Sequence, residues 1–175
     1  MHPVEIESAL ATMKILVDTR EHPGVKFRKR MAAMGLPYVR RKLDIGDYSA
    51  VVMVDDKELS IEDYVVIERK MDANELAMCF CQERSRFKAE FERAKEKGVK
   101  VYLLCENENL EKLYKGAFGE SEKYRSRMNP KSFMGSLYAF AAEYGMVPIF
   151  CREETSGKVI RDILYYEMRE RLKNG

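Results

Sequence analysis

Residues 66–70 read VIERK, two aliphatic residues followed by Glu68, Arg69 and Lys70. The apolar run over 64–68 predicts a buried strand that ends at this motif. Side chains alternate along a strand, so Glu68 and Lys70 are expected on one face and Arg69 on the other. The segment therefore places a carboxylate and an ammonium group side by side at a strand end.

Two further acidic segments precede this strand. The first, VDTRE (17–21), closes an apolar run that predicts a strand over 14–18, and it holds Asp18. The second, GDY (46–48), opens a predicted hairpin that brings Asp47 beside Glu68. Converging carboxylates suit Mg²⁺, and Lys70 would then orient water and stabilise charge that develops on phosphorus. Acidic residues at strand ends are also common on solvated surfaces, so the spacing alone leaves both readings open.

The remaining chain alternates between helical and strand patterns. Such alternation predicts an α/β domain of three layers, in which helices flank a central mixed β-sheet. Residues 1–13 read as an N-terminal leader before a single domain over 14–175. The expected helices are 25–34, 74–97, 109–114, 130–144 and 156–173, and the other expected strands are 38–43, 48–54, 99–105 and 146–151.

Composition excludes several protein classes. The 175 residues are 46% hydrophobic and 34% charged, with a net charge of +2, as in ordinary globular proteins. No apolar run is long enough to span a membrane, and the N-terminus lacks the basic region of a secretory signal, so we expect a cytoplasmic protein. The four cysteines lack zinc-ligand spacing and are expected to be buried free thiols.

In this order and spacing, VDTRE, GDY and VIERK resemble the XPF-type (ERCC4-like) structure-specific endonuclease domain of the PD-(D/E)xK nuclease superfamily. The resemblance continues through CQERSRFKAEFERA, VYLLCEN and SFMGSLYAFAAEYGMVPIF. It implies a restriction-endonuclease-like fold and hydrolysis of DNA phosphodiester bonds with Mg²⁺, for which Mn²⁺ substitutes. It also implies that the substrate is branched, flapped or forked DNA and that the protein acts in repair, recombination or replication. The resemblance further implies a homodimer. It implies no membrane partner and no nucleotide cofactor.

The resemblance assigns roles by position. Asp47 and Glu68 match the family's metal-binding carboxylates, and Asp18 matches its upstream acid on or near the metal. Lys70 matches the catalytic lysine and Arg69 the adjacent arginine, so the expected catalytic set is Asp47, Glu68, Arg69 and Lys70. Arg20 and Glu21 are candidates for accessory roles. We expect Arg20 either to contact the substrate or to form a salt bridge with Glu21 or Asp47.

One position departs from the family pattern. The acid that closes ERKxxxD is replaced by Asn74, although Asp72 and Glu75 lie nearby. Asparagine is expected to cap the following helix. If the missing acid is needed for a second metal, the chain is instead a weakened or inactive DNA-binding or scaffolding relative.

Basic residues offer contacts for DNA phosphates. We expect no helix-hairpin-helix module, so the chain resembles the stand-alone phage or prophage versions of the family. If the protein is bacterial or phage-encoded, we expect it in the nucleoid or in the infected-cell cytoplasm. The expected DNA-binding residues are Arg84, Arg86, Lys123, Arg125 and Arg127, the last three in a loop over 115–130. Further basic candidates are Lys26, Arg28, Lys29, Arg30, Arg40, Arg41, Lys42, Lys88 and Lys131.

Overall fold

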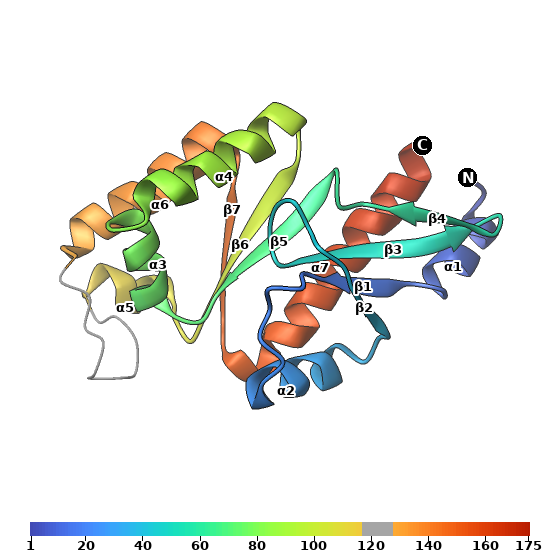
Figure 1. The fold of residues 1–175 in the computed structure, drawn as a ribbon, viewed down its shortest axis with the longest axis horizontal. Coiled ribbons are helices and arrows are strands. Elements are labelled where there is room, and N and C mark those ends of the chain that lie inside the picture. The colour runs from blue at the N-terminus through green and yellow to red at the C-terminus, as the bar shows by residue number, and fades with distance from the viewer. Residues whose placement is uncertain (117–127) are drawn as a thin grey trace. The chain divides into compact units, whose positions relative to one another are not determined.

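A computed structural model describes residues 1–116 and 128–175 (Figure 1). The loop expected over 115–130 lies largely outside these described residues. In chain order the elements are α1 (Pro3–Leu10), β1 (Lys14–Val17), α2 (Val25–Met34), β2 (Tyr38–Arg40), β3 (Tyr48–Val54), β4 (Lys57–Ser60), β5 (Val65–Lys70), α3 (Ala73–Phe80), α4 (Arg84–Lys97), β6 (Lys100–Glu106), α5 (Leu110–Tyr114), α6 (Pro130–Tyr144), β7 (Val147–Cys151) and α7 (Glu153–Asn174).

The strands form a mixed seven-stranded sheet flanked by helices, as the α/β prediction requires. Its order is β2-β1-β3-β5-β6-β7, and β4 pairs with β3 off this path. β3 runs antiparallel to β1, β4 and β5, whereas β1 with β2 and β6 with β7 are parallel pairs. The antiparallel pairing of β3 and β5 is the expected hairpin that links GDY to VIERK.

The chain divides into two compact units. Unit 1 comprises residues 1–67 and 154–175, and unit 2 comprises residues 68–153. The division falls within β5, so Asp18 and Asp47 belong to unit 1 and Glu68 and Lys70 to unit 2.

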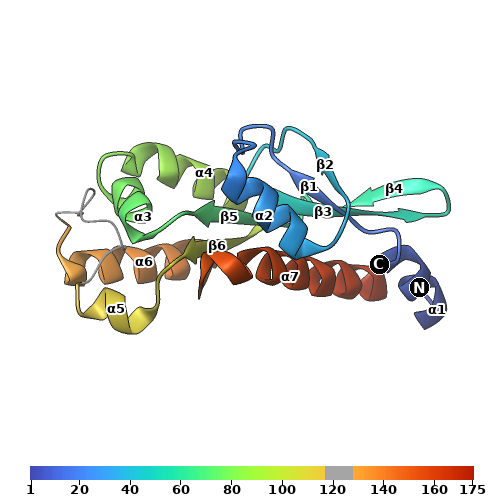
Figure 2. The same cartoon turned by 90° about the horizontal axis from the view of Figure 1, so that it is seen from below.

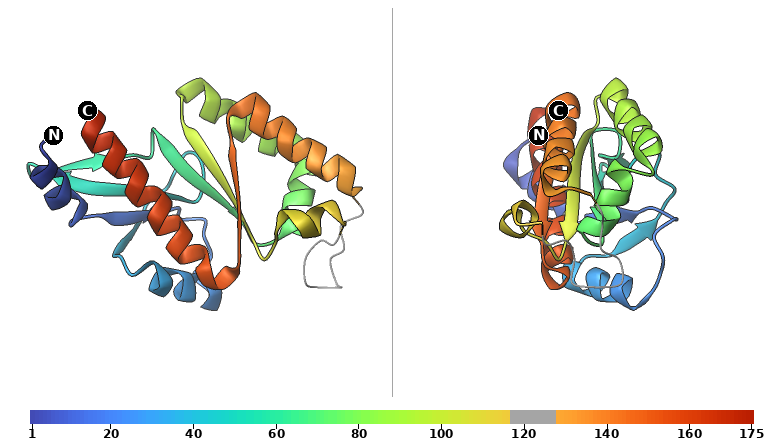
Figure 3. Two further views of the ribbon diagram at one scale, coloured as in Figure 1. Left: turned by 180° about the vertical axis from the view of Figure 1, so that it is seen from behind. Right: turned by 90° about the vertical axis from the view of Figure 1, so that its left-hand side faces the viewer.

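In unit 1, α7 crosses one face of β1 and β3, as Figure 3 (left) shows from behind. Its inward side chains recur every four residues at Ile160, Leu164 and Met168, all fully buried. Gly157 lets α7 approach α2 closely, because a Cβ there would lie 2.4 Å from the carbonyl oxygen of Arg30 (Figure 2). Residue 157 is therefore restricted to glycine by backbone contact.

In unit 2, an aromatic cluster joins α3, α4 and α6. Neighbouring ring centroids lie between 4.9 and 6.0 Å apart, within the range of favourable ring pairs. Phe140 contacts the rings of Phe80, Phe87, Phe91 and Tyr144 and so lies at the centre. The phenylalanine rings of this cluster, together with Phe133, are buried and form the core between these helices.

Three local predictions were incomplete or wrong. The single helix expected over 74–97 is two helices, α3 and α4, which run in different directions (Figure 1). The backbone N–H groups of Cys81 and Glu83 both donate to Met78 O, at 3.2 and 3.0 Å, and turn the chain. Residues 3–10, where no element was expected, form α1, and the polar segment between β3 and β5 contains β4.

Across the described ranges, no helix is both long and apolar enough to cross a membrane.

Candidate active site

The loop after β1 is organised around the carboxylate of Asp18, which is fully buried. Oδ1 accepts hydrogen bonds from the backbone N and Nε of Arg20, both at 2.7 Å, and Oδ2 accepts one of 2.7 Å from Leu43 N. Burial raises the pKa of Asp18, but the hydrogen bonds from Arg20 and Leu43 outweigh it and hold the pKa below its ordinary value. Arg20 thus pairs with Asp18, a partner that the sequence analysis did not consider.

Glu21, the last residue of VDTRE, is held by two donors from other elements. Its Oε2 accepts hydrogen bonds from the hydroxyl of Tyr48 at 2.9 Å and from Arg30 Nη1 at 3.3 Å. Arg30 is 4% exposed, so its prediction as a DNA-phosphate contact is wrong. The sequence held a signal for this: Arg30 lies three residues after Phe27 and four before Met34, on the apolar face of α2.

Arg40 of β2 holds the backbone of the same loop. Its Nη2 donates to the carbonyl oxygens of Thr19 at 2.7 Å and of Glu21 at 2.6 Å. Its guanidinium also lies 5.6 Å from the centre of the Phe27 ring. Arg20, Arg30 and Arg40 therefore each fix a different part of residues 18–21, which sequence reasoning did not foresee.

Asp47 follows Gly46, and the backbone geometry explains the GD pair. Gly46 has a φ of +72°, and a Cβ at this position would lie 2.9 Å from Val66 Cβ, so a larger residue is excluded. The N–H of Asp47 donates to Ile67 O and its carbonyl accepts from Asp18 N, both at 2.8 Å. The backbone of Asp47 is thus fixed between the end of β1 and the residue that precedes Glu68.

In unit 2, the face of β5 that carries Glu68 and Lys70 is as predicted. Lys70 Nζ donates to Glu68 Oε1 at 2.6 Å and lies 5.3 Å from the centre of the Phe87 ring. Burial lowers the pKa of Lys70, but the charge of Glu68 outweighs it and raises this pKa above its ordinary value. Burial also raises the pKa of Glu68, which is 7% exposed. The pair is a desolvated ion pair in which Lys70 keeps its proton.

Arg69 forms a different ion pair. Its Nη1 lies 3.1 Å from Oε2 of Glu106, which is fully buried at the end of β6. Sequence reasoning missed Glu106, because an acid that closes an apolar run, VYLLCE, gives no local signal that it pairs with Arg69.

The expected cap at Asn74 is wrong. Asp72 is the N-cap of α3, and its Oδ1 accepts the N–H of Glu75 at 2.9 Å. Glu75 Oε2 accepts the N–H of Met71, the residue before the N-cap, at 2.7 Å. Asn74 is the second residue of the helix and is 6% exposed.

Of the expected DNA-binding residues, Arg84 and Arg86 lie exposed in the first turn of α4. Arg84 Nη1 donates to Phe80 O at 3.2 Å and to Ser136 Oγ at 3.3 Å. Lys123, Arg125 and Arg127 lie outside the described residues. Among the residues described, no three His, Cys, Asp or Glu side chains gather closely enough to hold a metal ion.

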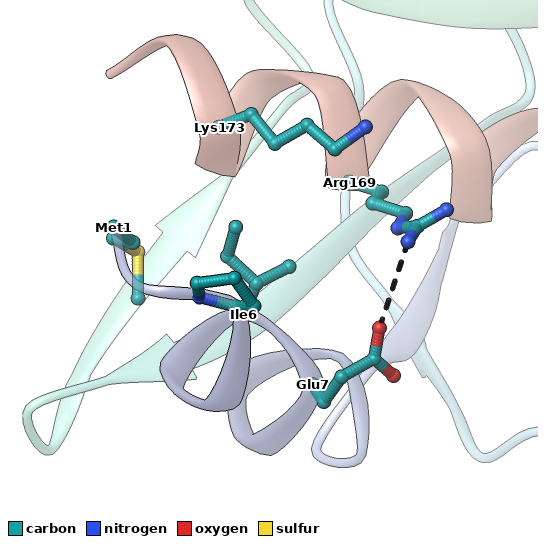
Figure 4. Close-up of a pocket in the computed structure, with 6 residues that line it drawn as sticks. Met1, Ile6, Glu7, Arg169 and Lys173 are labelled. Carbon is teal, nitrogen blue, oxygen red and sulfur yellow. Dashed lines mark ion pairs between the residues drawn. The ribbon is translucent and has the colours of Figure 1, made fainter.

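A pocket of about 200 Å³ lies elsewhere in unit 1, between α1 and the end of α7 (Figure 4). Ile6 and Pro3 contribute apolar lining, and Glu7 lies 4.0 Å from Arg169 across it. The lining contains none of the motif residues, so this pocket is separate from the candidate active site.

The ERCC4 domain family model matches residues 17–161, from the first residue of VDTRE into α7. The chain belongs to the ERCC4 domain family. Two solved structures of XPF from Aeropyrum pernix share its fold. The first has a TM-score of 0.62 at 18% identity, and the match covers 89% of this chain and 65% of that one.

The second structure is XPF from Aeropyrum pernix in complex with DNA. It gives a TM-score of 0.60 at 18% identity, with 90% of this chain and 66% of that chain covered. This ERCC4 chain therefore spans about two thirds of the length of the XPF chains. No curated protein matches its sequence.

Proposed function

We propose that this ERCC4 domain is a divalent-metal-dependent DNA endonuclease that cuts phosphodiester bonds in branched, flapped or forked DNA. The observation that carries the proposal is the buried pair of Glu68 and Lys70, 2.6 Å apart at the end of the strand that follows the GDY hairpin. A pre-organised carboxylate and ammonium are the groups that metal-assisted phosphodiester hydrolysis requires. Family membership supports the same chemistry, and DNA repair, recombination or replication would be its setting.

The carboxylates fit a hard cation. Glu68 is a buried acid whose pKa is raised by burial, so a cation beside it would favour the ionised form. Mg²⁺ is held in proteins by one or two carboxylates together with substrate phosphate. Asp47 and Glu68 would hold it, and Mn²⁺ would substitute. Asp18 stays in the proposal as a supporting acid, because Arg20 and Leu43 already occupy its oxygens.

The metal would supply a polarised phosphate and an activated water. Lys70 would orient that water and stabilise charge on the phosphate oxygens with its fixed ammonium group. Phe87 and Glu68 keep the ammonium from sampling other positions. Arg69 would act at the same strand end, from the opposite face.

DNA is the proposed partner, and one related XPF structure contains it. A second copy of this chain is also proposed. On α7, Val159 and Ile163 are half-buried and Tyr166 is 59% exposed. Spaced by four and three residues, they form a second apolar stripe beside the buried one, which a homodimer would cover.

The test is cleavage of labelled duplex, flap, fork and four-way-junction DNA with Mg²⁺, with Mn²⁺ and with EDTA. We expect metal-dependent cuts that Asp47→Ala and Glu68→Ala both abolish, while circular dichroism shows the fold intact. Glu58→Ala, which removes an exposed acid of β4, is the matched control and should cleave like the wild type. Cleavage retained in both active-site variants would refute the assignment.

A second candidate function is DNA binding without cleavage, which Asn74 favours because the family pattern has an acid there. Under this proposal the wild type binds DNA in a salt-sensitive manner and cuts none of the substrates. Asn74→Asp would then supply the acid of the family pattern and allow cleavage. The helix dipole tolerates an acid in the first turn of α3, so the variant should fold. Cleavage by the wild type removes this alternative.

A further inference from the structure

Glu106, the last residue of β6, contacts Arg69 of β5, and Asn107, which follows Glu106, contacts Met71, which follows β5. Glu106 has no exposed surface, and its Oε2 lies 3.1 Å from Nη1 of Arg69, whose side chain is 17% exposed. A buried ion pair gains little net stability over apolar packing, because desolvation offsets the attraction. Stability alone therefore does not account for charges at these two positions.

Asn107 adopts an uncommon backbone conformation, and both polar atoms of its side-chain amide form hydrogen bonds. Its φ is +62°, a region that asparagine enters more readily than most residues but at some cost. Its Nδ2 lies 3.5 Å from Met71 O, the carbonyl directly after ERK, and its Oδ1 accepts the N–H of Glu153 at 3.1 Å. Its own N–H donates to Cys151 O at 2.7 Å, the last residue of β7.

We propose that Glu106 and Asn107 form a brace that sets the orientation of the ERK strand end and are positioning residues for the proposed nuclease reaction. The inference rests on the proposed function and adds two residues to it. Arg69 lies between Glu68 and Lys70 in the chain, and its side chain leaves the opposite face of the strand. Anchoring Arg69 to Glu106 fixes the rotation of the strand about its own axis, and therefore the direction in which Glu68 and Lys70 point.

Asn107 adds the second anchor point. Its contact with Met71 O limits movement of the chain just beyond Lys70, while its links to Cys151 and Glu153 tie the brace to the end of β7 and the start of α7. A backbone conformation of raised energy persists where the surroundings over-determine it, often at functional sites. The hydrogen bonds of Asn107 with Met71, Glu153 and Cys151 hold its backbone in this conformation.

The brace is tested with Glu106→Gln, which keeps the shape but removes the charge, and with Asn107→Gly. Glycine adopts a φ of +62° without strain, so Asn107→Gly removes only the side-chain contacts. Glu96→Gln makes the same chemical change at an exposed site of α4 and is the matched control. Hydrogen–deuterium exchange of residues 68–72 reports the brace directly, without reference to activity.

We expect faster exchange over residues 68–72 in Glu106→Gln and Asn107→Gly, unchanged exchange in α6, and wild-type behaviour in Glu96→Gln. Single-turnover cleavage should fall by about tenfold, as for other groups that hold catalytic residues, with unchanged affinity for DNA in EDTA. Unchanged exchange in both variants would overturn the brace. If the wild type cuts no DNA while exchange rises as expected, the proposed function fails and the structural brace stands. A cleavage loss explained entirely by weaker DNA binding would show that the brace does not position the reacting groups.

Discussion

The ammonium of Lys70 lies 2.6 Å from Oε1 of Glu68, two residues earlier on the same strand. Each side chain is about one tenth exposed. Because little water reaches the pair, each charge is stabilised mainly by the other. The charge of Glu68 raises the pKa of Lys70, and the lysine therefore acts as a fixed cation and not as a proton acceptor near neutral pH.

The first prediction concerns that cation. Lys70→Met keeps the length of the side chain but removes the charge, and we expect cleavage to fall by about two to three orders of magnitude, as when one pre-organised donor to a transition state is lost. DNA affinity measured in EDTA should stay near the wild-type value. Single-turnover kinetics checks the rate. Lys70→Arg is the control that keeps the charge, and a wild-type rate in Lys70→Met would remove the catalytic role.

The second prediction concerns acid stability at Asp18. Its folded pKa lies below the ordinary 3.8 because Arg20 and Leu43 donate to the carboxylate, so as pH falls the unfolded chain takes up the proton first. The stabilisation is complete above about pH 3.8 and is lost as pH falls through the folded pKa. Asp18→Asn should lower the free energy of unfolding by about 2 kcal/mol at pH 7.

Urea titrations at pH 7, 5 and 3 measure this difference. The gap between wild type and Asp18→Asn should narrow at pH 3, because this pH lies below 3.8 and the carboxyl is then mostly protonated in the unfolded chain. Asp63→Asn, an exposed acid between β4 and β5, serves as the control. A gap that is constant across the three pH values would contradict the assigned hydrogen bonds.

The third prediction concerns the aromatic cluster. Phe140 is 2% exposed and contacts four other rings. Phe140→Ala should lower the free energy of unfolding by about 3–5 kcal/mol, because a large cavity replaces the ring. Phe140→Leu should cost clearly less. Thermal and urea unfolding provide the measurement, and equal losses in the two variants would show that the ring packing contributes little.

The fourth prediction concerns thiol reactivity. The expectation that all four thiols are buried is wrong for Cys81, which is exposed at the end of α3, whereas Cys79 and Cys105 are buried and Cys151 is half-buried. Burial raises the pKa of Cys79 to about 11, so at pH 8 it lacks the thiolate that reacts with disulfide reagents. We expect Cys81 to react fastest with Ellman's reagent and Cys79 only after unfolding. Cys81→Ser should remove the fast phase, and persistence of this phase would mean that the half-buried Cys151 or one of the buried thiols reacts as fast.

Much of the fold was accessible from the sequence because its signals are local. Helix α2, strand β3 and helix α6 have the predicted bounds, since glycine or proline marks the helix ends and a run of aromatic and β-branched residues marks the strand. The break between α3 and α4 was missed because no proline or glycine produces it. Backbone hydrogen bonds to Met78 turn the chain there, and the apolar pattern continues across the break.

For the candidate site, spacing predicted the pairing of Glu68 with Lys70, because two residues along a strand always share a face. Spacing could not predict that Asp18 pairs with Arg20, or that Arg30 reaches Glu21 from a helix, because these contacts depend on three-dimensional packing. Glu106 was missed for the same reason: its partner Arg69 lies 37 residues away in the chain.

The return of the chain to unit 1 through residues 154–175 has a consequence during protein synthesis. Unit 2 is continuous, so all of its residues have been made before α7, whereas the core of unit 1 lacks α7 until residues 154–175 have been made. Domains usually fold in the order of their synthesis, and here that order is reversed. The acids of unit 1 therefore reach their final setting only after α7 has been made, later than the residues of unit 2.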